Sequence, residues 1–309
     1  MRALCAFLLP VLIAVALPAA GAEVFSGSRA MDLLRWQCAL GPRTPGSEAH
    51  AVFRREVAAM ADSLGWRLSE DRFSAITPLD GVEREFINLV ISLGPSSGPR
   101  IWFGAHYDCR LVADQDPVAA SRSLPVLGAN DGASGTAVLL HLAELLTVTA
   151  PPLGVDLLLF DGEDQGVSGK PTTYCLGSEH LAAGAGTFGS PLSDAAPLGL
   201  IVVDMVGESG VRIPMEPLSL QYAGVWTRTV FERAGELGLG AFVPAPGRST
   251  YDDHVPFLRR GIPAVDLIDF EYAAWHTADD SPENCSAASL EQVGTLLLDL
   301  VRRPPMGGF

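Results

Sequence analysis

Five short hydrophobic runs are spaced along the chain, and each has the length and composition of a buried strand. They are rich in Val, Ile, Leu or aromatic residues and occupy residues 86–93, 100–107, 155–160, 200–206 and 263–268. Because apolar residues stand next to each other instead of alternating with polar ones, both faces of each strand are expected to be covered. The runs therefore predict a mainly parallel sheet with helices on both faces.

Helical patterns lie between the strand runs. Apolar residues recur at helical spacing after Ser47, which is a suitable N-cap, and Gly65 follows as a stop. Residues 134–146, 223–237 and 289–303 also have helical pattern or composition. The alternation of strands and helices is broken by no fixed-period repeat and no low-complexity linker. We predict one globular α/β domain with a mixed, mainly parallel β-sheet flanked by helices on both faces.

The first 22 residues have a different character from the rest. Arg2 is followed by an uncharged apolar run, and residues 17–22 read LPAAGA. One basic residue, a short hydrophobic stretch and a small-x-small ending are typical of a secretory signal peptide cleaved after Ala22. The stretch is shorter than the roughly 20 apolar residues that a span requires and no basic stop signal follows it, so an uncleaved anchor is the weaker alternative.

We therefore expect a signal peptide at residues 1–22 and a catalytic domain at residues 23–309. The expected location is secreted, periplasmic or otherwise extracytoplasmic, with no stable membrane insertion after removal of the signal.

Composition removes several classes of protein. The chain has 309 residues, of which 48% are hydrophobic, so intrinsic disorder, collagen-like repetition and a small disulfide-stapled fold are excluded. The formal net charge is −15. Binding to a phosphate backbone needs clustered Lys and Arg, so nucleic acid is not an expected partner.

Four cysteines remain after removal of the signal, at Cys38, Cys109, Cys175 and Cys285. In an oxidising compartment they could pair in more than one way. Their scattered spacing matches neither a CxxC redox pair nor a thiolate zinc site. We therefore expect any metal to be held by other residues.

Polar residues gather where the predicted strands end. Ligands of open parallel sheets bind beyond the carboxyl ends of the strands, so acids and imidazoles from distant parts of the sequence are expected to meet there. A further acid, Asp131, lies in a loop of small residues before a predicted helix, where an ordinary helix cap is the alternative interpretation. The residues at strand ends are His106, Asp108, Glu163, Asp164, Asp204 and Asp269.

Carboxylates and imidazoles without thiolates favour a hard to borderline cation, and zinc held by Asp, Glu and His is the common catalytic form. The tandem Glu163 and Asp164 point in different directions, so that one can bind the metal while the other faces the reacting group. An isolated acidic pair is usually a solvated turn, and a lone His is usually a surface residue. The joint occurrence of these residues with His276 in one order favours a site.

Five motifs in one order carry a family resemblance: HYD at 106–108, GANDGASG at 128–135, DGED at 161–164, VDMVG at 203–207 and WHTADD at 275–280. The chain resembles the zinc-dependent exopeptidase superfamily, which contains bacterial aminopeptidases and animal-type glutaminyl-peptide cyclotransferases. The resemblance extends from about residue 37 to residue 303. DDHVPFLRRGIP at 252–263 and the pair Trp275-His276 resemble the cyclase branch especially.

The resemblance to cyclases implies roles for single residues. Asp131, Asp164 and His276 match the ligands of a single zinc, although the second of these is commonly Glu in animal cyclases. Glu163 matches the general acid/base. The remaining matches are Asp204 and Asp252, two further acids beside the zinc, and Trp275, an aromatic wall of the substrate pocket.

The two-metal aminopeptidase branch implies a different use of the same residues. There, His106 and Asp204 would join Asp164 and His276 around a bridging Asp131, so a second zinc is possible. All five ligands are present in this sequence, and the inventory of ligands therefore does not choose between the branches.

Two departures from the animal cyclases affect the pocket. A Trp that follows their Glu-acid pair is replaced by the segment QGVSG at 165–169, and Asp266 stands where they carry a His. Ala105 and Thr136 occupy the positions of their disulfide. The chain therefore resembles bacterial relatives of the animal-type enzymes more closely.

The resulting hypothesis is a zinc-dependent glutaminyl-peptide cyclotransferase, an acyltransferase. It would convert the N-terminal glutamine of peptides and proteins to pyroglutamate and release ammonia. The alternative is a secreted zinc aminopeptidase that uses Glu163 to activate water and removes N-terminal residues. A second alternative is a binding protein with a metal-stabilised, non-catalytic crevice for peptides.

Overall fold

A computed structural model describes residues 23–187, 190–192 and 197–305. The predicted signal peptide lies outside the described residues. Six strands form the central sheet in the order β1 (Arg67–Ile76), β2 (Glu83–Leu93), β4 (Gly154–Phe160), β3 (Arg100–His106), β5 (Leu200–Asp204) and β8 (Ala264–Ile268). The last four are mutually parallel, whereas β2 runs antiparallel to both β1 and β4. The predicted mixed, mainly parallel sheet is confirmed.

Each central strand sends alternate side chains into two separate cores. In β5, Ile201 and Val203 belong to the larger hydrophobic cluster, whereas Leu200 and Val202 belong to the smaller one. The same alternation holds in β4, where Leu157 packs in the larger cluster. Since side chains of a strand point to opposite faces in turn, a strand that is apolar at every position must be covered on both sides.

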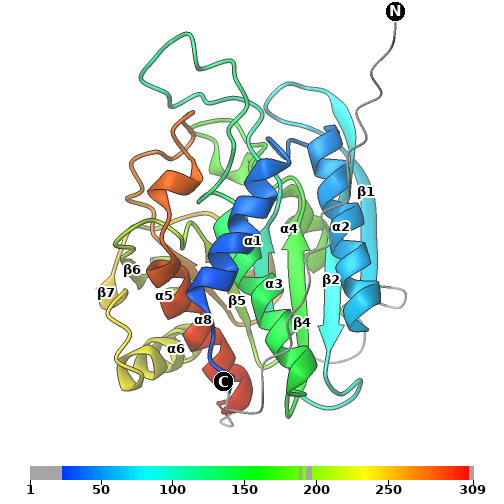
Figure 1. The fold of residues 1–309 in the computed structure, drawn as a ribbon, viewed down its shortest axis with the longest axis vertical. Coiled ribbons are helices and arrows are strands. Elements are labelled where there is room, and N and C mark those ends of the chain that lie inside the picture. The colour runs from blue at the N-terminus through cyan, green and yellow to red at the C-terminus, as the bar shows by residue number, and fades with distance from the viewer. Residues whose placement is uncertain (1–22, 188–189, 193–196, 306–309) are drawn as a thin grey trace, which may run out of the picture.

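Helices cover both faces of the sheet (Figure 1). The larger core receives buried side chains from α1 (Gly27–Ala39), α2 (Glu48–Leu64), α3 (Ala133–Val148), α6 (Gly224–Glu236) and α8 (Ala287–Arg302). The smaller core receives them from α4 (Leu176–Gly184) and α7 (His254–Leu258). The remaining elements are α5 (Pro217–Tyr222), the 3-10 helices η1 (Pro171–Thr173) and η2 (Pro282–Asn284), and a small parallel sheet of β6 (Ile213–Met215) and β7 (Phe242–Pro246).

The sequence patterns located the buried strands and four helices, but they missed α1, α4 and α7 as well as the exposed edge strand. Ser47 caps α2 by accepting from the His50 N–H, and Gly65 ends the helix in the left-handed conformation at φ 71°, as predicted. In contrast, β1 has no buried residue, because it is an edge strand that alternates between half-buried and exposed positions. Without an apolar run, its sequence carries little signal for a strand.

Glu216, at the start of α5, connects three segments of the chain and therefore allows a test of folding stability. Its buried carboxylate accepts from the Ser219 N–H at 2.6 Å and the Thr250 N–H at 3.2 Å, and His254 Nε2 lies 3.2 Å away. Burial alone would raise the pKa of Glu216, but the hydrogen bond and charge of His254 and the backbone donors hold this pKa below 4.5. The ionised carboxylate therefore contributes to folding stability.

We expect Glu216→Gln to lower the free energy of unfolding by about 2 kcal/mol at neutral pH, because an amide cannot satisfy both backbone donors. The stabilisation by a carboxylate with a lowered pKa is present above pH 4.5 and disappears as the pH falls through the folded-state pKa. The difference between the two proteins should therefore shrink below pH 4.5, as measured by urea unfolding at a series of pH values. Glu271→Gln, at an exposed position, is the control. A difference that does not change with pH would contradict the prediction.

Candidate active site

The polar residues predicted at strand ends meet at one end of the sheet. His106 ends β3, Asp204 ends β5, and Glu163 and Asp164 follow β4 in the next turn. Asp131 comes from the loop before α3. These side chains are all buried. The carboxyl ends of neighbouring parallel strands bring together residues that are far apart in the sequence.

Asp131, Asp164 and His276 form a first cluster. Nε2 of His276 lies 2.9 Å from Asp164 Oδ1 and 3.6 Å from Asp131 Oδ2. One possible ligand atom from each residue lies within 4.8 Å of the others. The three residues matched to the zinc ligands of cyclases therefore face a common point.

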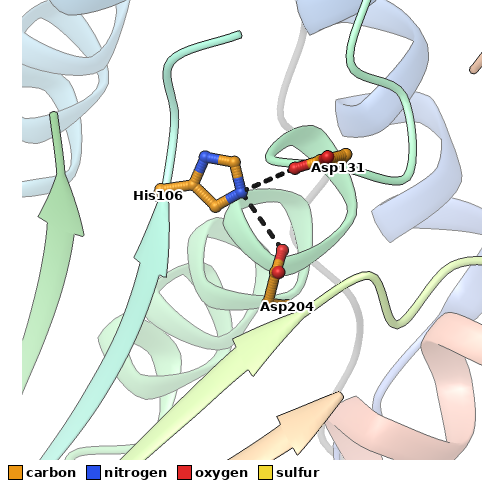
Figure 2. Close-up of side chains that lie close together, drawn as sticks. All are labelled: His106, Asp131 and Asp204. Atoms are coloured by element: carbon orange, nitrogen blue, oxygen red, sulfur yellow. Dashed lines mark hydrogen bonds and ion pairs between the residues drawn. The ribbon is translucent and has the colours of Figure 1, made fainter. Parts of the chain in front are cut away.

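His106, Asp131 and Asp204 form a second cluster (Figure 2). Nε2 of His106 lies 3.1 Å from Asp131 Oδ1 and 3.1 Å from Asp204 Oδ1. Asp131 thus directs one oxygen to each cluster, which is the position of the bridging residue implied by the aminopeptidase branch.

The first cluster fits a divalent cation. Two carboxylates and an imidazole, without sulfur, are donors that suit zinc. The surrounding acids also favour positive charge at this place: burial would lower the pKa of His276, but Asp164 and Asp114 raise it to about 9. Buried carboxylates gathered at this density need a compensating cation.

The loop that carries Asp131 depends on a glycine. Gly132 has φ 102°, and a Cβ at this position would lie 2.8 Å from the Asp108 carbonyl oxygen and 3.0 Å from the His106 ring. Asp280 accepts from the backbone N–H groups of Asn130 at 2.8 Å and Asp131 at 3.2 Å. The loop can therefore approach His106 closely. The hydrogen bonds to Asp280 hold the backbone of Asp131, which positions the Asp131 carboxylate.

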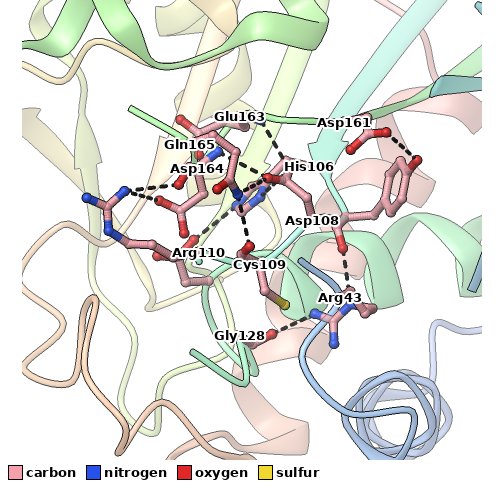
Figure 3. Close-up of polar contacts among 12 residues, drawn as sticks. Arg43, His106, Asp108, Cys109, Arg110, Gly128, Asp161, Glu163, Asp164 and Gln165 are labelled. Carbon is pink, nitrogen blue, oxygen red and sulfur yellow. Dashed lines mark hydrogen bonds and ion pairs between the residues drawn. The ribbon is translucent and has the colours of Figure 1, made fainter. Parts of the chain in front are cut away.

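Asp108 orients the pair Glu163 and Asp164 (Figure 3). Its carboxylate accepts from the Glu163 N–H at 3.1 Å, the Asp164 N–H at 3.4 Å and Gln165 Nε2 at 2.8 Å. Sequence analysis located Asp108 at the end of a strand but assigned it no role. The structure places it beneath the turn that carries both acids.

Asp114 is a residue of the site that sequence analysis did not identify. Asp114 Oδ1 lies 3.6 Å from His276 Nδ1, and the two Asp114 oxygens accept from Arg110 Nε at 2.6 Å and Nη2 at 3.0 Å. Arg110 also donates to Asp164 Oδ1 at 3.3 Å. Burial alone would raise the pKa of Asp114, but His276 and Arg110 hold it well below its usual range. Asp114 is therefore an ionised partner of the imidazole.

We expect Asp114→Asn to weaken zinc binding about 10- to 100-fold, because a carboxylate behind a ligating imidazole orients the ring and strengthens it as a donor. The measurement is competition for zinc against a chelator of known affinity. Asp279→Asn, at an exposed position near His276, is the matched control and should bind zinc like the unaltered protein. Equal affinities of the Asp114 and Asp279 variants would contradict the prediction.

Glu163 lies close to other carboxylates, among them Asp252 and Asp164. Burial raises its pKa well above 4.5, and the charges of Asp252 and Asp164 raise it further, against the opposing effect of His106. Burial also raises the pKa of Asp252 to about 7, and the charge of Asp204 adds to this. A carboxyl group with a raised pKa is suited to exchange protons near neutral pH.

These residues open into a pocket of about 290 Å³. Trp275 lines it and stacks on His276 with ring centroids 3.7 Å apart. Phe270 lies beside Trp275 with a centroid distance of 5.1 Å. The pocket thus combines the first cluster, Glu163 and Asp252 with an aromatic wall.

Asp269, which the sequence analysis placed at a strand end, lies outside the active site in the part of the chain that the structure describes. Its carboxylate accepts from the backbone N–H groups of Arg212 at 2.7 Å and Glu271 at 3.3 Å. It lines a neighbouring cavity of about 350 Å³ and belongs to neither cluster.

Comparisons with known proteins show what the chain as a whole resembles. The profile described as Peptidase family M28 matches residues 88–301. The chain is 29% identical over 299 residues to a "Glutaminyl-peptide cyclotransferase-like protein" of Bos taurus, covering 85% of this chain and 73% of that protein.

Two solved structures show the likeness in three dimensions. Tannerella forsythia glutaminyl cyclase has a TM-score of 0.84 at 32% identity, and the match covers 92% of this chain and 100% of that one. A leucine aminopeptidase precursor from Bacteroides thetaiotaomicron VPI-5482 has a TM-score of 0.85 at 28% identity, with 93% and 100% covered. Relatives with this fold are therefore named for two different activities.

Proposed function

This chain belongs to peptidase family M28, and from that premise we propose that it is a glutaminyl-peptide cyclotransferase. It would act on the N-termini of peptides and proteins, convert glutamine to pyroglutamate and release ammonia. The observation that carries the proposal is the likeness, over 85% of the chain, to proteins named glutaminyl-peptide cyclotransferase or glutaminyl-peptide cyclotransferase-like protein. The pocket of about 290 Å³ supports it, because acids beside an aromatic wall in a concave site are typical of small-ligand binding.

We assign one zinc ion to Asp131, Asp164 and His276. When bound there, the ion would draw electron density from the oxygen of the substrate's side-chain amide and stabilise the negative charge that develops on it. We favour a single ion because the motifs that resemble the cyclase branch match three ligands to one zinc. His106 Nε2 and Asp204 Oδ1, which lie 3.1 Å apart, would then pair with each other.

Glu163 would accept a proton from the α-amine and return it to the departing nitrogen. The amine attacks the carboxamide carbon of its own residue, so the nucleophile is already tethered and positioning supplies much of the acceleration. The raised pKa of Glu163 suits both directions of proton transfer.

Asp204 and Asp252 would hold the amine and the leaving group. Both line the pocket, and Asp252 presents an oxygen within 4.8 Å of Glu163. Trp275 would give the small substrate side chain a flat apolar surface.

We also propose that residues 1–22 are an export signal and that residues 23–309 form the catalytic domain, which places the enzyme outside the cytoplasm. Among the residues that the structure describes, no helix is long and apolar enough to cross a membrane.

The test is the fate of a synthetic peptide that begins with glutamine, incubated with the zinc-loaded protein and followed by mass spectrometry. Cyclisation gives a product lighter by one ammonia, which a coupled ammonia assay confirms. A peptide that begins with asparagine is the control. An unchanged glutamine peptide would overturn the proposal.

The second cluster favours aminopeptidase activity as the second candidate. His106 and Asp204 share Asp131 with the first cluster, as a second zinc would require. In that case Glu163 would deprotonate water, and the same experiment would release free N-terminal amino acids.

A further inference from the structure

A third cluster of possible ligand atoms lies behind the pocket, at Glu163, Cys175 and Asp252. One atom from each residue lies within 4.8 Å of the others, and all three side chains are buried. Sequence analysis gave Cys175 no role beyond possible disulfide pairing. Unlike the first two clusters, this one contains sulfur.

The backbone holds Cys175 against Glu163. Cys175 has φ 62°, an uncommon conformation for a residue with a side chain. Its N–H donates to the Glu163 carbonyl at 2.9 Å, and the next N–H, of Leu176, donates to the Gly162 carbonyl at 3.2 Å. The thiol is thereby held with Sγ 3.5 Å from Glu163 Oε1.

Asp252 has one carboxylate oxygen that is available to a ligand when no substrate is bound. Its Oδ1 accepts from the Asp253 N–H at 2.5 Å, whereas its Oδ2 is buried without a hydrogen-bond partner within the described residues. A buried carboxylate oxygen without a partner is costly unless something binds it. Glu163 and Asp252 also line the pocket, so the cluster borders it.

We propose that Glu163, Cys175 and Asp252 form an inhibitory site for a soft to borderline divalent cation, such as Cd²⁺ or excess Zn²⁺. One thiolate and two carboxylates make a donor set that suits these ions and not Mg²⁺ or Ca²⁺. The site is distinct from the cluster of Asp131, Asp164 and His276, which has no sulfur donor.

Coordination requires loss of the thiol proton. Burial and the charge of Glu163 hold the pKa of Cys175 well above its usual value, so in the absence of a cation the thiol is protonated and donates to Glu163. When the cation binds, the S–H bond breaks, a sulfur–metal bond forms and the proton leaves to solvent. The cation also occupies Glu163, and inhibition by this route rests on the proposed function of that residue, whereas binding does not.

The test adds Cd²⁺ to zinc-loaded protein and records the ultraviolet absorbance of the cadmium–thiolate charge transfer. We expect a saturable band in the unaltered protein, its loss in Cys175→Ser, and its retention in Cys285→Ser, whose cysteine lies outside the cluster. Turnover of a glutamine peptide by the unaltered protein should fall about 100-fold or more, the lower bound for removing a general acid/base.

Anomalous diffraction from cadmium-soaked crystals of the unaltered protein locates the ion without any substitution. A peak between Glu163, Cys175 and Asp252 supports the site. A band that persists in folded Cys175→Ser, or the absence of both band and peak in the unaltered protein, overturns it. The absorbance and the diffraction decide the site even if the protein cyclises no peptide, so failure of the proposed function is distinguishable from failure of this inference.

Discussion

Replacing Glu163 by Gln is expected to reduce cyclisation by about 10²- to 10⁴-fold while the zinc content stays unchanged. Glutamine has nearly the same shape but cannot accept a proton from the α-amine. Glu163 belongs to neither of the clusters that contain histidine, so the candidate zinc ligands keep their positions. The measurements are kcat with a glutamine peptide and zinc per chain by elemental analysis.

The control for this substitution is Glu232→Gln, at an exposed position of α6, which should leave both quantities unchanged. A Glu163 variant that turns over at the rate of the unaltered protein would remove this residue from the mechanism. Loss of zinc together with activity would show instead that Glu163 supports the metal site.

Removing the metal is expected to have a comparably large effect. Chelation should lower turnover by at least about 10³-fold, because the ion supplies several kcal/mol of charge stabilisation in the transition state, and added zinc should restore it. Asp131→Asn should reproduce the loss, since Asp131 contributes an oxygen to the first cluster. Activity that survives chelation, with zinc shown to be absent, would contradict the assignment.

Asp204→Asn separates the one-ion proposal from the two-ion alternative. Asp204 contributes to the second cluster with His106 and not to the first. With one ion, this substitution should leave zinc per chain unchanged, whereas with two ions it should lower the zinc content. Comparing the zinc content of Asp131→Asn with that of Asp204→Asn therefore shows whether the chain binds one zinc ion or two.

The side-chain contacts that position the site residues could not be predicted from the sequence. Asp280 supports the Asp131 loop across 149 residues of sequence, and Arg110 contacts Asp164 across 54. Asp280 ends the motif WHTADD, but neither this motif nor the sequence around Arg110 shows what the two side chains contact. His276 adopts φ 55°, and nothing in the short motif WHTADD indicates this conformation. Such features depend on which loops the completed sheet brings together.

The sequence alone is enough to predict the strands that are apolar on both faces, the mainly parallel sheet and the set of polar residues at the strand ends. This is possible because side chains alternate between the two faces of every strand, and because the carboxyl ends of parallel strands lie at the same edge of a sheet. The three-dimensional structure is needed to see that Asp131 faces two clusters at once, that Asp114 stands behind His276 and that Cys175 contacts Glu163. Distances of this kind are set by long-range packing, which brings side chains to within a few ångströms regardless of their separation along the chain.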